Sequence, residues 1–318
     1  MNNIFKELFN VPVMLNGNLI VMKASSEFEN QQLTNNIFTD KWLKQDMKRQ
    51  LESIEMFQLK WYLDLYGFSD ENDFKEFLQT KRIILDAGCG LGYKAAWMAL
   101  LSPNSIVIGM DFSDAVFSAS THYEGISNLF FVKGDIAQTN INEDSIDYIS
   151  CDQVIHHTEK PEKTFEHLSE ILSKSGQLAC YVYAKKALPR ELLDEYFRTF
   201  TKKCTKQELW EMSEQLTALG KTLSELNIKI IVPDVPLLNI KGGLYDIQRF
   251  IYWNLLKCFW NEEFGWDSSV STNFDWYGPV NASRYSEEEF RSWIINNNLN
   301  IMYFHKEEAC YSGRFLRV

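Results

Sequence analysis

One segment, residues 84–92, constrains the fold of this chain more than any other. It joins an apolar run, which ends in the carboxylate Asp86, to a cluster of glycines, and a second apolar run follows at 95–101. The glycines alternate with other residues: Gly88, Gly90 and Gly92. A strand, a tight turn and a helix are predicted, because glycine adopts left-handed dihedral angles at little cost. Free N–H groups at the start of such a helix attract acceptor atoms, so the segment predicts a nucleotide-like ligand.

The spacing of the glycines separates several classes of ligand. A dinucleotide fingerprint is G-x-G-x-x-G, and a phosphate-binding loop ends in Gly-Lys-Ser/Thr. This chain instead has D-x-G-x-G-x-G, followed by Tyr93 and Lys94. An NAD-linked oxidoreductase is therefore disfavoured, and a glycine turn that binds no ligand is the simplest alternative.

Apolar strands and amphipathic helices alternate after the turn, which predicts a parallel sheet with crossover helices. Strands are expected at 82–86, 106–110, 129–132, 146–151 and 177–183, and helices at 93–101, 113–122 and 161–172. A helix at 286–297 and strands at 299–305 and 309–317 complete the expected sheet. The fold class is therefore α/β, with a Rossmann-like, mostly parallel sheet of seven strands.

Two further regions lie outside this alternation. Before it, Asn16-Gly17 predicts a hairpin between short β-rich runs, and apolar residues every three or four positions predict one long helix over 41–66. Within it, residues 187–285 contain helical patterns at 188–200, 205–226 and 244–260 and then an aromatic loop. The expected organisation is an N-terminal cap, a ligand-binding core, a helical insertion and a final part of the core: residues 1–80, 81–186, 187–285 and 286–318.

Carboxylates follow the later strands as well. Asp111 closes the strand after the glycine turn, where a doubly wound fold binds ribose hydroxyls. As an alternative, Asp111 caps a helix that begins near Ser113. Together with Asp135-Ile136 after the third strand and the strand ending at Asp152, these segments resemble the class I S-adenosylmethionine (SAM) methyltransferases. The resemblance covers 82–183 best and says little about the insertion.

The resemblance implies the cofactor SAM and a role for each matched residue. The methionine part of SAM is expected at Asp86 and the three glycines, the ribose at Asp111 and the adenine at Asp135 and Ile136. The end of the fourth strand, with Asp152, is expected to face the methyl donor. The long helix over 41–66 is expected to cover this pocket, as N-terminal helices commonly do in the family. Relatives often begin with a cysteine-bearing zinc ribbon, but residues 1–40 contain no cysteine, so no metal is expected.

Two adjacent histidines, His156 and His157, come just after the fourth strand and resemble a His-His-Thr segment of small-molecule methyltransferases. Methyl transfer from a sulfonium is an in-line displacement, and a hydroxyl acceptor must also lose a proton. Histidine titrates in the useful range, so either imidazole is a candidate base. The alternative is structural, with one ring bonded to the backbone and the other packed in the core.

The insertion is rich in aromatic residues near 259–277. Aromatic walls can orient an acceptor and exclude water, and neighbouring polar groups can bond it. The candidate substrate-binding residues are Asp275, Trp276, Tyr277 and Arg284. The alternative is that these rings form the core of the insertion.

Composition limits the partners. The net charge of −11 and the absence of a basic stripe argue against nucleic acid. Six cysteines without a C-x-x-C pair, and no apolar run of membrane-spanning length, predict a cytoplasmic protein away from membranes. The expected function is SAM-dependent methylation of a hydroxyl or amine on a small molecule, such as a sugar or a secondary metabolite. A SAM-binding module or sensor without catalysis is the alternative, and the oligomeric state is open.

Overall fold

The computed structural model describes residues 2–22, 28–44 and 51–318 and divides the chain into two compact units. The first, here called the sheet unit, comprises residues 1–43, 55–184 and 283–318. The second, the insertion unit, comprises 44–54 and 185–282.

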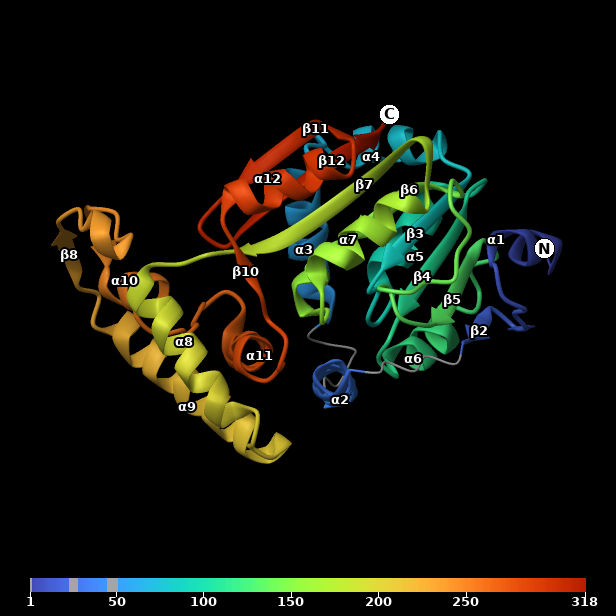
Figure 1. The fold of residues 1–318 in the computed structure, drawn as a ribbon. Coiled ribbons are helices and arrows are strands. Elements are labelled where there is room, and N and C mark those ends of the chain that lie inside the picture. Colours follow the sequence, from blue (N-terminus) through green and yellow to red (C-terminus); the bar gives the residue numbers. More distant parts are fainter. Residues whose placement is uncertain (1, 23–27, 45–50) are drawn as a thin grey trace. The chain divides into compact units, whose positions relative to one another are not determined.

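The sheet unit is built on a ten-stranded sheet in the order β1-β2-β5-β4-β3-β6-β7-β12-β11 (Figure 1). The tenth strand, β10, pairs in parallel with the end of β7, on the edge of β7 opposite β12. Its strands are β1 Leu15–Asn16, β2 Leu19–Val21, β3 Ile83–Ala87, β4 Ile106–Asp111, β5 Leu129–Lys133, β6 Ile146–Cys151, β7 Leu172–Ala184, β10 Arg284–Tyr285, β11 Leu299–Lys306 and β12 Cys310–Arg317. The pairs from β2 through β5, β4, β3 and β6 to β7 are parallel, and β12 is antiparallel to both neighbours. The predicted α/β class with a mostly parallel sheet is confirmed.

Helices cover both faces of this sheet. Buried side chains of α1, α7 and α12 share one hydrophobic cluster with the sheet, and those of α3, α4, α5 and α6 share the other. The helices are α1 Asn2–Leu8, α2 Glu29–Lys44, α3 Leu51–Tyr66, α4 Glu71–Gln79, α5 Tyr93–Leu101, α6 Ala115–His122, the 3₁₀ turn η1 Ile155–His157, α7 Pro161–Glu170 and α12 Glu287–Asn296. Strand β3 shows why both layers form, because Leu85 packs into the first cluster and Ile84 into the second.

The N-terminal region differs from the sequence prediction in two ways. The hairpin β1–β2 forms as predicted, but it also extends the main sheet, because β2 pairs with β5 in parallel. The single helix predicted over 41–66 is wrong at its start: α2 already begins at Glu29, in a stretch whose polar residues hid the helical pattern. Residues 45–50 of that predicted helix lie outside the described residues, and α3 covers the remainder.

The insertion unit is mainly helical, as predicted, with a two-stranded sheet added. Its elements are α8 Leu188–Thr201, α9 Lys206–Glu225, β8 Lys229–Val232, the 3₁₀ turn η2 Pro236–Leu238, β9 Gly243–Asp246, α10 Ile247–Asn254 and α11 Gly265–Tyr277. The helix predicted over 244–260 is shorter than expected, since β9 occupies its first residues. The prediction of an aromatic loop is wrong, because these residues form the helix α11. The rings of Trp210 and Phe274 stack at 3.8 Å between centroids and hold α11 on α9.

No helix in the described part of the chain combines the length and the apolar character needed to cross a membrane.

Candidate functional site

The centre of the sheet contains a topological switch point between β3 and β6. These two strands are parallel neighbours. In the sequence β3 is followed by β4 and β5, which lie on one side of it, and β6 is followed by β7, which lies on the other side. In open α/β sheets, ligands bind outside the carboxyl ends of the strands at such a point. The glycine turn follows β3 and the segment 152–157 follows β6, so the predicted glycine turn and the candidate base residues come from the two strands that flank the switch.

The glycine turn has the backbone that the sequence predicted. All three alternating glycines have positive φ: +86° at Gly88, +53° at Gly90 and +80° at Gly92. A Cβ at Gly88 would lie 2.4 Å from Val154, and one at Gly92 would lie 2.7 Å from Phe131. Any side chain at Gly88 or Gly92 would therefore collide with a neighbouring side chain of the protein. Close packing of the turn, as well as its dihedral angles, requires glycine here.

Asp86 lies at the carboxyl end of β3, buried at 3% exposure. Its Oδ2 atom has no hydrogen-bond partner among the described residues. Burial raises the pKa of Asp86 to about 7, against the attraction of Lys94 and with repulsion from Asp152. A buried carboxylate oxygen without a donor is costly, and a cationic or donating ligand group would satisfy it. This unsatisfied oxygen fits the ammonium or sulfonium of SAM.

Asp111 is the last residue of β4, which neighbours β3, and Asp135 follows β5, the next strand beyond β4. One oxygen of Asp111 accepts the N–H of Gly90 at 2.7 Å and the other accepts the N–H of Ser113 at 2.7 Å. The bond to Gly90 ties the carboxylate to the glycine turn. The bond to Ser113 holds the segment after β4, but Asp111 is not the helix cap that the alternative expected, because α6 begins at Ala115 and its N-cap residue is Asp114. Each oxygen of Asp111 keeps a second lone pair for a further donor.

Asp152 has protein partners that sequence reasoning missed. Its carboxylate forms a buried ion pair with Lys94, and it accepts the Tyr66 hydroxyl at 2.7 Å. Although burial opposes it, Asp152 holds the pKa of Lys94 above its usual range. A lysine within the apolar run of α5 was the sequence signal for this pair. The partner Asp152 could not be inferred, because Lys94 lies in the segment after β3 and Asp152 in the segment after β6, and no local pattern links them.

Gln153, next to Asp152, has a left-handed backbone with φ of +62°. Such a conformation is uncommon for a residue with a side chain, and it turns the chain out of β6 into η1. The Gln153 amide donates to Gln58 of α3 at 2.8 Å and to Asp152 at 3.1 Å. Helix α3 therefore fixes the bend that positions the two histidines.

Helix α2 lies against the carboxyl edge of the sheet. A Cβ added to Gly90 would be 3.2 Å from the ring of Trp42, so the indole lies directly on the glycine turn. Thr39 accepts the N–H of Asp114 at 3.2 Å, and the ring of Phe38 is 4.9 Å from that of His157. The sequence predicted one covering helix over 41–66; in the described residues, α2 lies on the glycine turn and α3 contacts Asp152 and Gln153 after β6.

His156 and His157 lie in an aromatic cluster at the end of β6. The His156 ring is fully buried and packs on Tyr183 at 3.7 Å between centroids. The His157 ring is 4.3 Å from that of His156, and it also contacts Tyr183 and Phe38 edge-on. The packing alternative therefore has direct support for His156. His157 is also buried, but the residue retains 6% exposure.

The four predicted substrate residues are divided between the units. Trp276 and Tyr277 lie in the insertion unit, where both donate to the buried carboxylate of Asp194, at 2.8 and 3.1 Å. Asp275 precedes them on α11, whereas Arg284 belongs to β10 of the sheet unit. The two rings are core side chains of the insertion unit, as the alternative expected.

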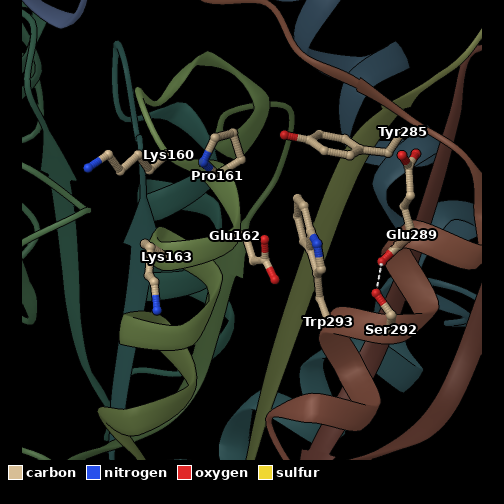
Figure 2. Close-up of a pocket in the computed structure, with 8 residues that line it drawn as sticks. All are labelled: Lys160, Pro161, Glu162, Lys163, Tyr285, Glu289, Ser292 and Trp293. Carbon is tan, nitrogen blue, oxygen red and sulfur yellow. Dashed lines mark hydrogen bonds between the residues drawn. The ribbon is translucent and has the colours of Figure 1, made fainter.

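A pocket of about 490 Å³ lies between the beginnings of α7 and α12 (Figure 2). Its walls are Lys160, Pro161, Glu162 and Lys163 on one side and Tyr285, Glu289, Ser292 and Trp293 on the other. Tyr285 and Trp293 meet edge to face at 4.5 Å. None of the predicted site residues lines this pocket, so it is separate from the carboxylates of the strand ends.

Comparison with known proteins places the site in a family context. Residues 78–229 match the family model described as "Methyltransferase domain". The tRNA U34 carboxymethyltransferase of Campylobacter fetus is 35% identical over 118 residues, which are 35% of this chain and 40% of that protein. The malonyl-[acyl-carrier protein] O-methyltransferase of Legionella pneumophila is 30% identical over 98 residues, or 30% of this chain and 34% of that protein.

Among solved structures, magnesium protoporphyrin IX methyltransferase from Synechocystis, with bound SAM, has 12% identity and a TM-score of 0.47 over 93% of this chain and all of that chain. The chain spans less than half the length of the two curated relatives that it matches.

Proposed function

We propose that this chain is a class I SAM-dependent methyltransferase, as the match of residues 78–229 to a methyltransferase domain supports, and that it transfers a methyl group to a hydroxyl or amine of a small molecule. The observation that carries this proposal is the unsatisfied buried oxygen of Asp86 at the switch point, beside the glycine turn. An anionic group there suits a cationic donor. When bound, SAM supplies an electrophilic methyl group on a sulfonium.

The residues proposed to hold SAM come from four adjacent strand ends. Asp86 and the turn Gly88, Gly90 and Gly92 hold the methionine part. Asp111 accepts the ribose hydroxyls, and Asp135 with the buried Ile136 contacts the adenine. Asp152 is proposed to act through Lys94 and Tyr66, by fixing the start of α5 against the end of β6. Trp42 excludes water from the turn by lying over Gly90.

The proposed base is a histidine at the end of β6. A base must touch the acceptor proton, which requires ring surface, and His157 has more of it than the fully buried His156. His156 is proposed to hold the ring of His157 in place through their contact at 4.3 Å. An acceptor oxygen must also lie in line with the methyl group and the sulfur, so the protein's main task is alignment.

We propose that the acceptor is a small molecule and not a nucleic acid. We also propose that the protein acts in the cytoplasm. The charge of −11 opposes binding of a polyanion. The named acceptors of the relatives range from tRNA to an acyl carrier protein and a porphyrin. The acceptor therefore has to be found by experiment.

The proposal is tested by incubating the protein with methyl-labelled SAM and a small-metabolite extract from its host, followed by mass spectrometry. We expect the label in a metabolite of low mass, and we expect this transfer to be lost in Asp86→Asn. Binding of SAM without any labelled product in extracts that include RNA and protein would favour the non-catalytic SAM-binding module. Label in tRNA would overturn the small-molecule acceptor.

A further inference from the structure

The pocket between the beginnings of α7 and α12 has no part in the proposed function. Its volume of about 490 Å³ lies within the range that small organic ligands occupy. All of its wall residues belong to the sheet unit. Helix α7 follows β6 through η1, and β10, which supplies Tyr285, pairs with the last residues of β7. The pocket therefore lies beside the elements that carry the two candidate histidines.

An aromatic corner forms one wall of this pocket. The rings of Tyr285 and Trp293 meet edge to face at 4.5 Å between centroids. Trp293 also contacts the rings of Phe165 and Phe290, both at 5.8 Å, so the core of the sheet unit fixes its position. Tyr285 is only half-buried and keeps part of its surface exposed. The face of an exposed aromatic ring carries partial negative charge and attracts cations.

A carboxylate adds a full negative charge at this corner. Glu162 lies in the first turn of α7, and its exposed side chain points toward the ring of Trp293 (Figure 2). No described residue forms a hydrogen bond or an ion pair with this carboxylate. Burial raises the pKa of Tyr285 to about 12, and the charges of Glu289 and Glu162 contribute to the rise, against a hydrogen bond with Ser283. Both carboxylates therefore act electrostatically on the exposed ring.

The two lysines of the wall are directed away from the corner. The ammonium of Lys163 bonds to Glu166 at 2.6 Å, and that of Lys160 lies 4.8 Å from the centroid of the Phe28 ring. Figure 2 shows both lysine side chains pointing away from the two aromatic rings of the pocket. A cation at the corner would therefore contact aromatic and carboxylate groups, and the lysine charges would lie outside the pocket.

We propose that this pocket binds an organic ammonium ion, with Glu162 as its counter-ion and the ring of Tyr285 as the face on which it lies. Aromatic faces recognise alkylated ammonium groups, because such cations are weakly hydrated and have an apolar surface. Trp293 closes the back of the site. The inference does not rest on the proposed methyl transfer, and it assigns the pocket a ligand of its own.

Hydrogen bonds connect this pocket to the segment of the candidate base. The N–H of Ser283 donates to the carbonyl of His156 at 2.9 Å, and the hydroxyl of Tyr285 bonds to Ser283. On the side of α7, Thr164 donates to Thr158, the residue after the two histidines, at 3.1 Å. A ligand that holds α7 and β10 together should therefore slow hydrogen exchange in residues 155–165 and 283–293.

Calorimetric titration of the full chain without SAM tests the site. The probes are benzyltrimethylammonium, benzylammonium and the uncharged benzyl alcohol, at low ionic strength. We expect one ammonium ion to bind at least tenfold more tightly than benzyl alcohol, and the preferred ion shows whether the ligand is quaternary or primary. Glu162→Gln should weaken its binding about threefold and Glu162→Lys at least tenfold. The matched variant Glu170→Gln, at the exposed end of the same helix, should bind as wild type does.

A second pair of variants tests the aromatic face. Tyr285→Leu should weaken binding of the ammonium ion at least threefold, whereas Tyr285→Phe keeps the ring and should retain it. Melting temperatures check that each variant is folded, and the Glu162 variants decide the outcome if Tyr285→Leu is not. Equal affinity for the ammonium ions and benzyl alcohol, no binding of any probe, or unchanged binding in Glu162→Lys would overturn the cation site. Failure of label transfer from SAM would leave these results unaffected and would overturn the methyl-transfer proposal alone.

Discussion

The two units satisfy their buried carboxylates differently. At the carboxyl edge of the sheet, Asp86 and Asp152 repel each other and both attract Lys94, and the Oδ2 atom of Asp86 has no hydrogen-bond partner among the described residues. In the insertion unit, the carboxylate of Asp194 accepts from the Arg190 guanidinium, the Trp276 indole and the Tyr277 hydroxyl. The first carboxylate cluster therefore has an oxygen left for a ligand, whereas the donors around Asp194 come from the protein itself.

The two buried ion pairs also differ in construction. Lys94 and Asp152 come from α5 and the segment after β6, so their pair depends on the assembled sheet. Arg190 and Asp194 lie one turn apart on α8, and their helix alone brings them together. A change at the first pair should therefore disturb the cofactor site, whereas a change at the second should first disturb the stability of the insertion unit.

The largest expected effect is a loss of catalytic rate on changing a histidine of the sheet unit. His157→Ala should lower kcat by about 10²–10⁴-fold, the usual contribution of a general base. His156→Ala should lower kcat less, with a larger loss of stability, because the deleted ring is fully buried. Steady-state kinetics and the melting temperature of each variant separate the two roles. Equal, small effects on kcat from both variants would remove the histidines from the mechanism.

The next effect concerns the stability of the insertion unit. Asp194→Ala leaves the Arg190 guanidinium buried without its carboxylate and should lower the free energy of unfolding by about 3–5 kcal/mol. Denaturant unfolding measures the change, and the exposed Glu214→Ala on the neighbouring α9 should stay within about 0.5 kcal/mol of wild type. A loss below 1 kcal/mol in Asp194→Ala would mean that water or another group compensates Arg190.

Asp86→Asn probes the buried carboxylate oxygen of the sheet unit that has no hydrogen-bond partner among the described residues. Loss of a charge-assisted bond of about 1.5–3 kcal/mol should raise the Kd for SAM roughly 10- to 100-fold. In wild type, SAM affinity should increase as the pH rises through about 7, since Asp86 then becomes ionised. Titrations of both proteins at pH 6 and 8 test this, and the variant should show no such increase.

The same carboxyl group affects the protein without ligand. Because the folded pKa of about 7 lies above the unfolded value near 3.8, the contribution of Asp86 is present at low pH and is lost as the pH rises through 7. Asp86→Asn should therefore flatten the decline of the melting temperature between pH 5 and 8. A decline as steep as that of wild type would show that other groups cause it.

The sheet could be predicted from the sequence because its pattern is local. Apolar strand runs that end in glycine or aspartate, such as the one before Asp86, identify both the strand and its carboxyl end. The helix α11 could not be predicted in this way. Its serines, asparagine and aromatic residues have modest helix propensity, and contacts such as Trp210 on Phe274 and Asp194 with Trp276 stabilise it.

The candidate site was predictable to a similar degree. The carboxylates at strand ends follow from the topology of a parallel sheet, so Asp86, Asp111 and Asp135 could be named in advance. Partners such as Lys94 for Asp152 depend on how separate connections meet, which no local pattern encodes. The pair Arg190 and Asp194 is different, because its i,i+4 spacing on a predicted helix was visible in the sequence.

The smallest expected effect tests whether the two units respond separately. Each unit has a helix with a capping box: Thr205 with Glu208 begins α9, and Ser286 with Glu289 begins α12. Replacing either cap by alanine should cost about 1 kcal/mol, because a backbone N–H of the first turn loses its acceptor. Hydrogen exchange measured by peptide mass spectrometry should show Thr205→Ala loosening the insertion unit and Ser286→Ala the sheet unit. Saturating SAM should offset the loss in Ser286→Ala and leave that in Thr205→Ala, since binding stabilises the unit that holds the ligand. Equal rescue of both variants would mean that the two units unfold together as one cooperative structure.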